Sequence, residues 1–180
     1  MTAPLKKPAF SRLSLTPLLA PLLATLVACS PASTTQGPVE ITDHTPCDLD
    51  GMVLSEYPGP KAQLHYVDEI GQPLFFCDTT ELFNVVLKPE QQRKVKAIYV
   101  QDMAQTDWDE PHGAWIDAKT AFYVVGSSRH GSMGPTIGSF SSKEAAEKFA
   151  AEFGGHVHPF SEITEDMSQL DGGALHDQMM

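Results

Sequence analysis

The apolar positions in the first half of the folded region predict two strands, a helix and a third strand. Apolar and polar residues alternate along 61–67, as in a strand with one buried face, and an apolar run follows at 73–77. A capping-box pattern with its carboxylate at Glu81 opens a helix over 78–87, and 95–100 reads as another strand. This order of elements is a ββαβ unit.

The second half of the region repeats this plan with one insertion. Strands are predicted at 120–125 and 137–140, joined by a long Gly- and Ser-rich loop at 126–135. A second capping-box pattern begins a helix over 141–153, whose apolar residues recur at helical spacing before two glycines end it. The closing strand is predicted at 156–160.

The two units match around their helix caps. Aligning Asp78 with Ser141 also aligns the two capping-box glutamates and keeps the core period of both helices. We therefore predict an α+β fold of tandem ββαβ units, about 47–103 and 115–160, within a domain over 47–168. Each small sheet is covered by one helix.

Residues 1–28 have the pattern of a lipoprotein signal peptide and are left out of the fold prediction. Three basic residues precede an apolar stretch at 13–27, which two prolines make too short and too interrupted for a membrane-spanning helix. The stretch ends in a lipoprotein-type cleavage box at Cys29, whose sulfur would carry the lipid. The alternative, an ordinary secretory signal with a chance cysteine, also exports the chain.

Polar segments flank the predicted domain. Residues 29–46 are rich in Ser, Thr, Pro and Gly and predict a flexible tether from lipidated Cys29, whereas 169–180 predicts a disordered tail. Ser30, directly after the cysteine, is typical of lipoproteins sent to the outer membrane. We expect a periplasm-facing, lipid-anchored protein at the outer membrane.

The chain carries a strong negative charge. It has 12 basic and 23 acidic residues, and removal of 1–28 takes away three basic residues and no acidic one, which leaves a formal charge of −14. Such a surface repels nucleic acid and argues against a polybasic membrane patch. The lipid is then the expected membrane contact, and cations or positively charged protein surfaces are the expected partners.

Cys47 is the thiol for which the sequence offers no structural role. Cys29 is assigned to the lipid, and Cys77 lies in an apolar strand, where a free thiol acts as a small hydrophobe. Cys47 stands in a turn-rich segment shortly before Met52, and soft sulfur ligands select Cu(I) over harder cations. A Cys47–Cys77 disulfide is the alternative, which the placement of one in a turn and the other in a strand disfavours.

Three methionines could join Cys47. Met52 follows a glycine, Met103 ends a predicted strand, and Met133 lies in the glycine-rich loop. Two or three of them converging on Cys47 would make the low-coordinate sulfur site that Cu(I) prefers. Core packing is the alternative role for each methionine. The spacing typical of zinc sites is absent from the sequence.

The histidines are weaker candidates for the same site. His130, in the loop of Met133, and His112, in another loop, could each contribute a ligand. His156 and His158 share one face of a strand, but their place at its end favours exposed imidazoles. Motifs for a nucleophile elbow, a phosphate-binding loop or a dinucleotide site do not occur, so little points to catalysis.

These motifs together resemble the NosL family, copper-binding lipoproteins that assist maturation of nitrous-oxide reductase. The resemblance runs in order along Cys47 with Gly51-Met52, Gly59-Pro60-Lys61-Ala62-Gln63, Tyr99-Val100-Gln101-Asp102-Met103, Trp115-Ile116-Asp117-Ala118, Ala121-Phe122-Tyr123-Val124-Val125-Gly126-Ser127 and Gly131-Ser132-Met133-Gly134. It implies a Cu(I) chaperone without enzymatic turnover. The implied partners are a membrane ABC-type transporter complex with a periplasmic subunit, and the reductase itself. It also implies a fold related to that of organomercurial lyase.

One departure from the family pattern narrows the site. Some members carry Cys-x-x-Cys-Gly-Met, whereas Asp50 stands here in the second cysteine position. The resemblance therefore implies one thiolate with thioethers, and the ligands in order of preference are Cys47, Met52, Met103, Met133 and His130. We expect Cys47→Ser to abolish Cu(I) binding and Cys77→Ser to leave it intact. A thiol-dependent enzyme of the organomercurial-lyase type, using Cys47, is the alternative, but that chemistry needs a second thiol near an acid.

Overall fold

The computed structural model describes residues 37–68 and 71–170 of the 180-residue chain. Every described residue belongs to one compact unit. The predicted signal peptide, Cys29 and most of the predicted tail lie outside the described residues. Among the residues that are described, helices long and apolar enough to cross a membrane are absent.

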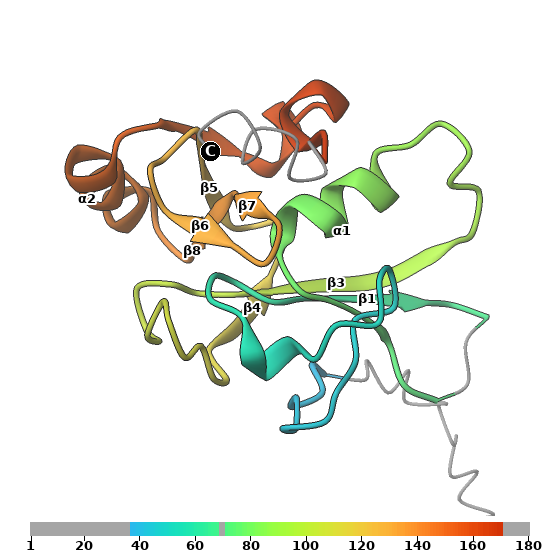
Figure 1. The fold of residues 1–180 in the computed structure, drawn as a ribbon. Helices are drawn as coiled ribbons and strands as arrows, with labels where there is room; N and C mark the ends of the chain where they lie inside the picture. Colours follow the sequence, from blue (N-terminus) through green and yellow to red (C-terminus); the bar gives the residue numbers. More distant parts are fainter. Residues whose placement is uncertain (1–36, 69–70, 171–180) are drawn as a thin grey trace, which may run out of the picture. The chain divides into compact units, whose positions relative to one another are not determined.

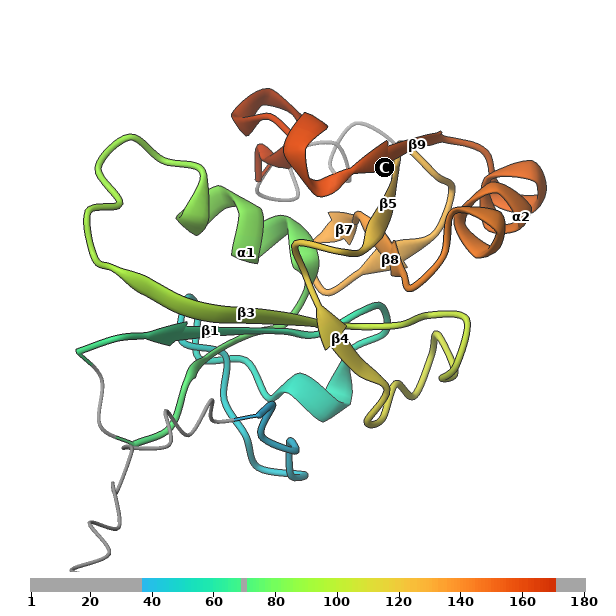
Figure 2. The same ribbon diagram turned by 180° about the vertical axis from the view of Figure 1, so that it is seen from behind.

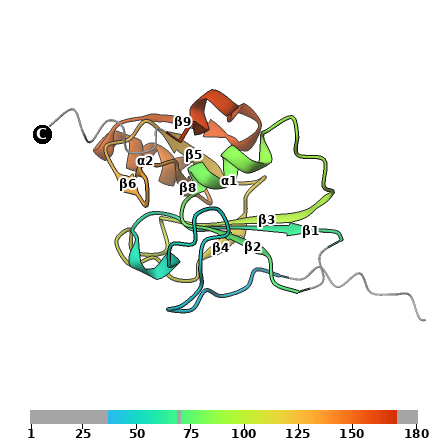
Figure 3. The same cartoon turned by 45° about the vertical axis from the view of Figure 1, so that its right-hand side comes forward.

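An antiparallel sheet with strand order β2-β1-β3-β4 forms the first half of the fold (Figures 1 and 3). Its strands are β1 (Ala62–Tyr66), β2 (Leu74–Phe76), β3 (Val95–Gln101) and β4 (Trp115–Asp117). Every residue of β1 is buried, because α1 lies on one face of the sheet and residues 37–60 lie on the other, as Figures 1 and 3 show. The first ββαβ unit is therefore packed on both sides.

The helix α1 (Thr79–Val86) begins where the sequence predicts. The Asp78 Oδ1 accepts hydrogen bonds from the backbone N–H groups of Thr80 at 2.9 Å and Glu81 at 3.2 Å, which satisfies two donors of the first turn. Phe83 is fully buried in the main core and packs edge-to-face against Tyr123 of the second unit. The cap and this core contact together fix the start of α1 on the sheet.

The second unit repeats the topology of the first. Its sheet has the order β8-β5-β9, so the second strand, first strand and third strand of the unit lie side by side, as β2, β1 and β3 do. The elements are β5 (Phe122–Val125), β8 (Gly138–Phe140), α2 (Lys143–Phe153) and β9 (His156–Pro159). The helix α2 packs against all three strands. The predicted tandem α+β fold is confirmed.

Several local features differ from the prediction. β4 lies at the start of the predicted second unit, 115–160, but pairs with β3 of the first sheet, as Figure 2 shows. The long predicted loop contains a small hairpin, β6 (His130–Gly131) with β7 (Gly134–Pro135). Ser142, rather than Ser141, caps α2 by accepting the N–H of Ala145 at 3.2 Å. The predicted alignment of Asp78 with Ser141 is therefore one residue too early.

The folded region begins before Cys47. Within the predicted tether, the Val39 backbone N–H and C=O pair with the side-chain amide of Gln63 in β1, and Ile41 packs against the hydrophobic cluster that contains Cys47. The polar composition of this segment concealed the apolar residues that attach it to the sheet. Three short 3-10 helices complete the described part of the chain, η1 (Leu54–Glu56), η2 (Phe160–Glu162) and η3 (Glu165–Ser168).

Candidate metal centre

A tight loop places Cys47 and Met52 opposite each other. Pro46 and Val53 form a β-bridge, the Cys47 N–H donates to the Met52 carbonyl at 2.7 Å, and the Gly51 N–H donates back to the Cys47 carbonyl at 2.9 Å. Gly51 has φ +80°, a conformation that costs glycine little and other residues more. The turn-rich composition of the segment therefore closes a short hairpin-like loop.

Reciprocal hydrogen bonds attach this loop to β2. The Asp48 N–H donates to the Phe75 carbonyl at 2.8 Å, and the Phe75 N–H donates to the Asp48 carboxylate at 2.6 Å. The Leu49 N–H points back at the Cys47 Sγ at 3.4 Å. These contacts hold the sulfur of Cys47 against the end of β2, where the next residue beyond the strand is Cys77.

Cys47, Cys77 and Glu81 form a buried cluster of potential metal ligands. One ligand atom from each residue lies within 4.8 Å of the other two. The Cys47 thiol donates to the Glu81 Oε2 at 3.2 Å, and the same oxygen accepts the Cys77 backbone N–H at 2.9 Å. Cys47 is 3% exposed and Cys77 is fully buried. The cluster is therefore shielded from bulk water.

Protons are distributed unequally over this cluster. A hydrogen bond from the Cys77 thiol is the main cause that lowers the pKa of Cys47 to about 6. Burial, followed by the charge of Asp78, raises the pKa of Glu81 to about 9. The hydrogen bond to Cys47, followed by burial, raises the pKa of Cys77 far above its usual range. The 3.2 Å contact alone fits a proton on either atom, but these pKa directions place it on Glu81 at neutral pH and leave Cys47 as the thiolate.

Lys61 places a positive charge next to the cluster. Its Nζ donates hydrogen bonds to the carbonyls of Tyr57 at 2.7 Å, Pro58 at 3.1 Å and Cys77 at 3.0 Å, so the buried ammonium has three acceptors. Burial lowers its pKa to about 8, which keeps it largely protonated at neutral pH. The ammonium offsets the charge of a thiolate at Cys47, because opposite charges interact strongly away from water.

The predicted sulfur ligands fall in three different places. Met52 is half-buried and packs against the hydrophobic cluster that contains Cys47 and Cys77. Met103 packs instead with the cluster of Val124 under α2, just beyond the end of β3. The structure thus brings Met52 to Cys47, whereas Met103 belongs to the core of the second unit. Neither ligand assignment is tested by these positions, and both stay predictions.

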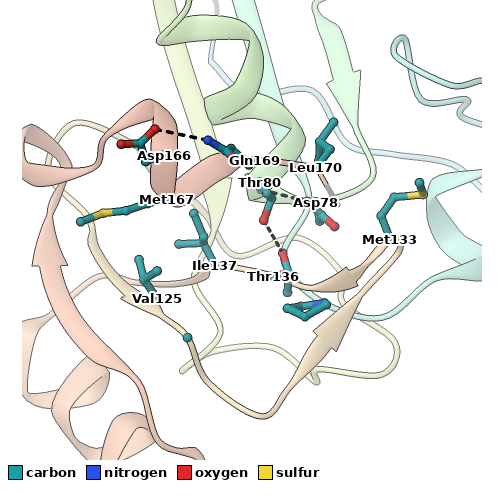
Figure 4. A pocket seen from close by; sticks show the side chains of 12 residues that line it. Asp78, Thr80, Val125, Met133, Thr136, Ile137, Asp166, Met167, Gln169 and Leu170 are labelled. Carbon is teal, nitrogen blue, oxygen red and sulfur yellow. Dashed lines mark hydrogen bonds between the residues drawn. The ribbon is translucent and has the colours of Figure 1, made fainter. Parts of the chain in front are cut away.

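Met133 and His130 lie on the β6–β7 hairpin. Met133 is 38% exposed and lines a cavity of about 360 Å³ together with Asp78 and Met167. Figure 4 shows Met133 and Met167 at opposite sides of this cavity rather than pointing together. His130 is exposed, and its backbone carbonyl accepts the Trp108 indole N–H at 2.9 Å. Their roles as further ligands also stay predictions.

Sequence reasoning missed Cys77 and Glu81. Cys77 has the apolar strand environment expected of a core thiol, and Glu81 was assigned only to the helix cap. One signal could have found them, because a capping-box carboxylate reaches back to the residues that precede its helix. Here the Glu81 carboxylate accepts the Cys77 N–H, so Glu81 lies beside a cysteine.

The fold and the cluster define a class of protein, a tandem ββαβ domain with a shielded cluster of two thiols and a carboxyl group that could hold a metal ion. Comparison with known sequences identifies the family. The sequence model of the NosL family matches residues 38–168, and the chain belongs to this family.

The chain is similar to two relatives along most of its length. It is 36% identical over 178 residues to the copper-binding lipoprotein NosL of Stutzerimonas stutzeri, covering 94% of this chain and 92% of the relative. It is 40% identical over 155 residues to the protein of the same name from Achromobacter cycloclastes, covering 83% and 80%. The crystal structure of the copper chaperone NosL from Shewanella denitrificans superposes with a TM-score of 0.68 at 42% identity, covering 73% of this chain and 98% of that one.

Proposed function

We propose that this chain is a lipid-anchored Cu(I) chaperone that supplies copper for maturation of nitrous-oxide reductase. The observation that carries the proposal is the shielded Cys47 thiol, with a second thiol and a carboxyl group within 4.8 Å. With a pKa of about 6, Cys47 is available as a thiolate at neutral pH, and thiolates are the form that binds metal. Soft sulfur favours Cu(I), and the names of the copper-binding relatives support copper as the metal.

The copper-binding part is tested by a competition titration. The full chain, purified in detergent and kept reduced and anaerobic, is titrated with Cu(I) against a chromophoric chelator. We expect one tightly bound Cu(I) in the wild type and none in Cys47→Ser. Leu49→Ala is the matched control in the same loop, because Leu49 is exposed and offers no ligand atom. Wild-type affinity in Cys47→Ser would refute the site.

The proposed recipients of the copper are the reductase and its maturation complex, an ABC-type transporter with a periplasmic subunit. The formal charge of −14 after removal of 1–28 favours recipients with positively charged docking surfaces. In cells that depend on this chain, Cys47→Ser should lower the copper content of the reductase while the protein level of the chain stays unchanged. A copper-replete reductase in that strain would contradict the pathway.

The proposed anchor is a lipid on Cys29, with the domain facing the periplasm from the outer membrane. Mass spectrometry of the N-terminal peptide should find the lipid mass on Cys29. Cys29→Ser should release the chain from the membrane fraction without changing its Cu(I) affinity. Separation of the two membranes on a density gradient tests the outer-membrane location.

The geometry also favours a second candidate function, cleavage of a carbon–mercury bond. That reaction requires a second thiol near an acid, and Cys77 and Glu81 provide both beside Cys47. A sulfur would bind mercury, and a proton from Glu81 would pass to carbon as the bond breaks, which releases the hydrocarbon and leaves mercury on the sulfurs. Incubation with phenylmercury and measurement of benzene separates the two functions, because a chaperone yields none.

A further inference from the structure

We propose that Cys77 is the second thiolate ligand of the copper site, so that Cu(I) is held between Cys47 and Cys77. This inference rests on the proposed function and changes its ligand set. The sequence predicts a single thiolate with thioethers, because Asp50 occupies the position of a second cysteine in the loop. In the fold the second thiol comes from the end of β2 instead, 30 positions beyond Cys47.

The two sulfurs lie close enough for one metal ion to bind both. Metal–thiolate bonds are about 2.3 Å for zinc, so two such bonds on opposite sides of an ion span up to about 4.6 Å. The potential ligand atoms of Cys47 and Cys77 lie within 4.8 Å of each other. The Cys77 Sγ also lies 3.8 Å from the Met52 carbonyl, so the sulfur of Cys77 faces the loop that carries Cys47.

The charge of the buried cluster is also compatible with this ligand pair. When Cu(I) enters between the sulfurs, one positive charge is added and the proton of the Cys77 thiol leaves to solvent, so the net buried charge is unchanged. An uncompensated charge in this shielded position would be costly. The Lys61 ammonium, bonded to the Cys77 carbonyl at 3.0 Å, lies where it stabilises the negative charge of a bis-thiolate complex.

Glu81 acts in this arrangement as a positioning residue. Soft Cu(I) binds carboxylate oxygen poorly, whereas sulfur is its preferred donor. Glu81 instead holds both cysteines, through the Cys47 sulfur at 3.2 Å and the Cys77 N–H at 2.9 Å. Glu81 therefore holds the two cysteines next to each other before the metal binds.

The experiment compares three variants of the full chain, reduced and anaerobic, in the same Cu(I) competition titration. We expect Cys77→Ala and Cys77→Ser to bind Cu(I) on the order of 100-fold more weakly, about 2.7 kcal/mol. Leu54→Val is the packing control, because Leu54 lies fully buried in the same cluster and offers no ligand atom. Its affinity should equal that of the wild type. Wild-type affinity in both Cys77 variants would overturn the proposal.

A second measurement does not depend on the folding of the Cys77 variants. X-ray absorption spectroscopy of copper-loaded Met52→Leu counts the sulfur atoms around copper once the nearest thioether is removed. Two sulfur neighbours are expected, and a single sulfur would overturn the proposal. Loss of binding in Cys47→Ser with unchanged binding in the Cys77 variants would reject this inference alone, whereas unchanged binding in Cys47→Ser would reject the proposed function.

Discussion

A hydrogen bond joins Cys47 to Glu81, 34 positions further along the chain, at an Sγ–Oε2 distance of 3.2 Å. The contact joins a loop outside the first sheet to the first turn of α1. The same carboxylate accepts the Cys77 N–H, so one side chain sets the positions of both sulfurs. The site therefore depends on the fold of the whole first unit.

Proton sharing in this cluster predicts how the stability of the metal-free protein depends on pH. Glu81 has a raised pKa of about 9. Its contribution to the free energy of unfolding is therefore fully present below pH 4.5, the ordinary pKa of a glutamate, and is lost as pH rises towards 9. Cys47 has a lowered pKa of about 6. Its contribution to the free energy of unfolding is therefore fully present above pH 9.0, the ordinary pKa of a cysteine, and is lost as pH falls towards 6. Between pH 6 and 8 the two groups change the free energy of unfolding with pH by equal amounts in opposite directions, so their effects cancel.

Two substitutions should separate these slopes. In Cys47→Ser the free energy of unfolding should fall as pH rises from 6 to 8, and in Glu81→Gln it should rise, each by up to about 1.4 kcal/mol per pH unit. Urea unfolding with chelator and reductant present measures both slopes. Glu147→Gln, an exposed carboxyl on α2, is the control and should match the wild type. Parallel curves in all four proteins would contradict the assignment.

The methionines should differ in their effect on copper. Met52 packs against the cluster of Cys47, whereas Met103 packs with Val124 in the second unit. We expect Met52→Leu to weaken Cu(I) binding by about tenfold and Met103→Leu to weaken it less. Leucine keeps most of the side-chain volume, so each substitution should change stability by less than about 1.5 kcal/mol. An equal loss of affinity in both variants would place Met103 at the metal.

Most of the fold follows from local sequence signals. The helix ends and the strands of both units are predicted to within a few residues. The signals are the cap at Asp78, the glycines at 154–155 and the alternation of apolar residues in each strand. The pairing of β4 with the first sheet could not be predicted, because Trp115–Asp117 is short and a strand pairing across units has no periodic signature. The attachment of Val39 to Gln63 could not be predicted either, because the polar composition of residues 29–46 concealed it.

The site was predictable only in part. Cys47 and Met52 are close in sequence, and the loop between them brings them together, as local turn residues suggest. Cys77 lies beside Cys47 because the hydrogen bonds between Asp48 and Phe75 attach the loop to β2. Such a contact depends on tertiary packing, which a single sequence does not encode in any spacing. An apolar environment, moreover, makes a ligand cysteine look like a core residue.

The turn between α2 and β9 predicts a difference between two adjacent glycines. Gly154 and Gly155 have φ values of +77° and +95°, so alanine is strained at both positions. At Gly155 a Cβ would also lie 2.7 Å from the Val125 carbonyl oxygen and 2.9 Å from the Ser127 nitrogen, whereas at Gly154 the space is open. Gly154→Ala should cost about 1–2 kcal/mol and Gly155→Ala at least about 1 kcal/mol more, measured by urea unfolding. Equal losses would show that the turn relaxes.

The two cysteines should form a disulfide when the metal-free protein is oxidised. Both are free thiols in the structure, and their ligand atoms lie within 4.8 Å. Diamide, an azo oxidant, would take up the two electrons and two protons released as the Cys47–Cys77 bond forms. Peptide mass spectrometry should then find the linked peptides. Because a bound Cu(I) occupies the sulfur of Cys47, copper-loaded protein should resist the reaction. Equal rates of oxidation with and without copper would mean that the metal lies away from both sulfurs.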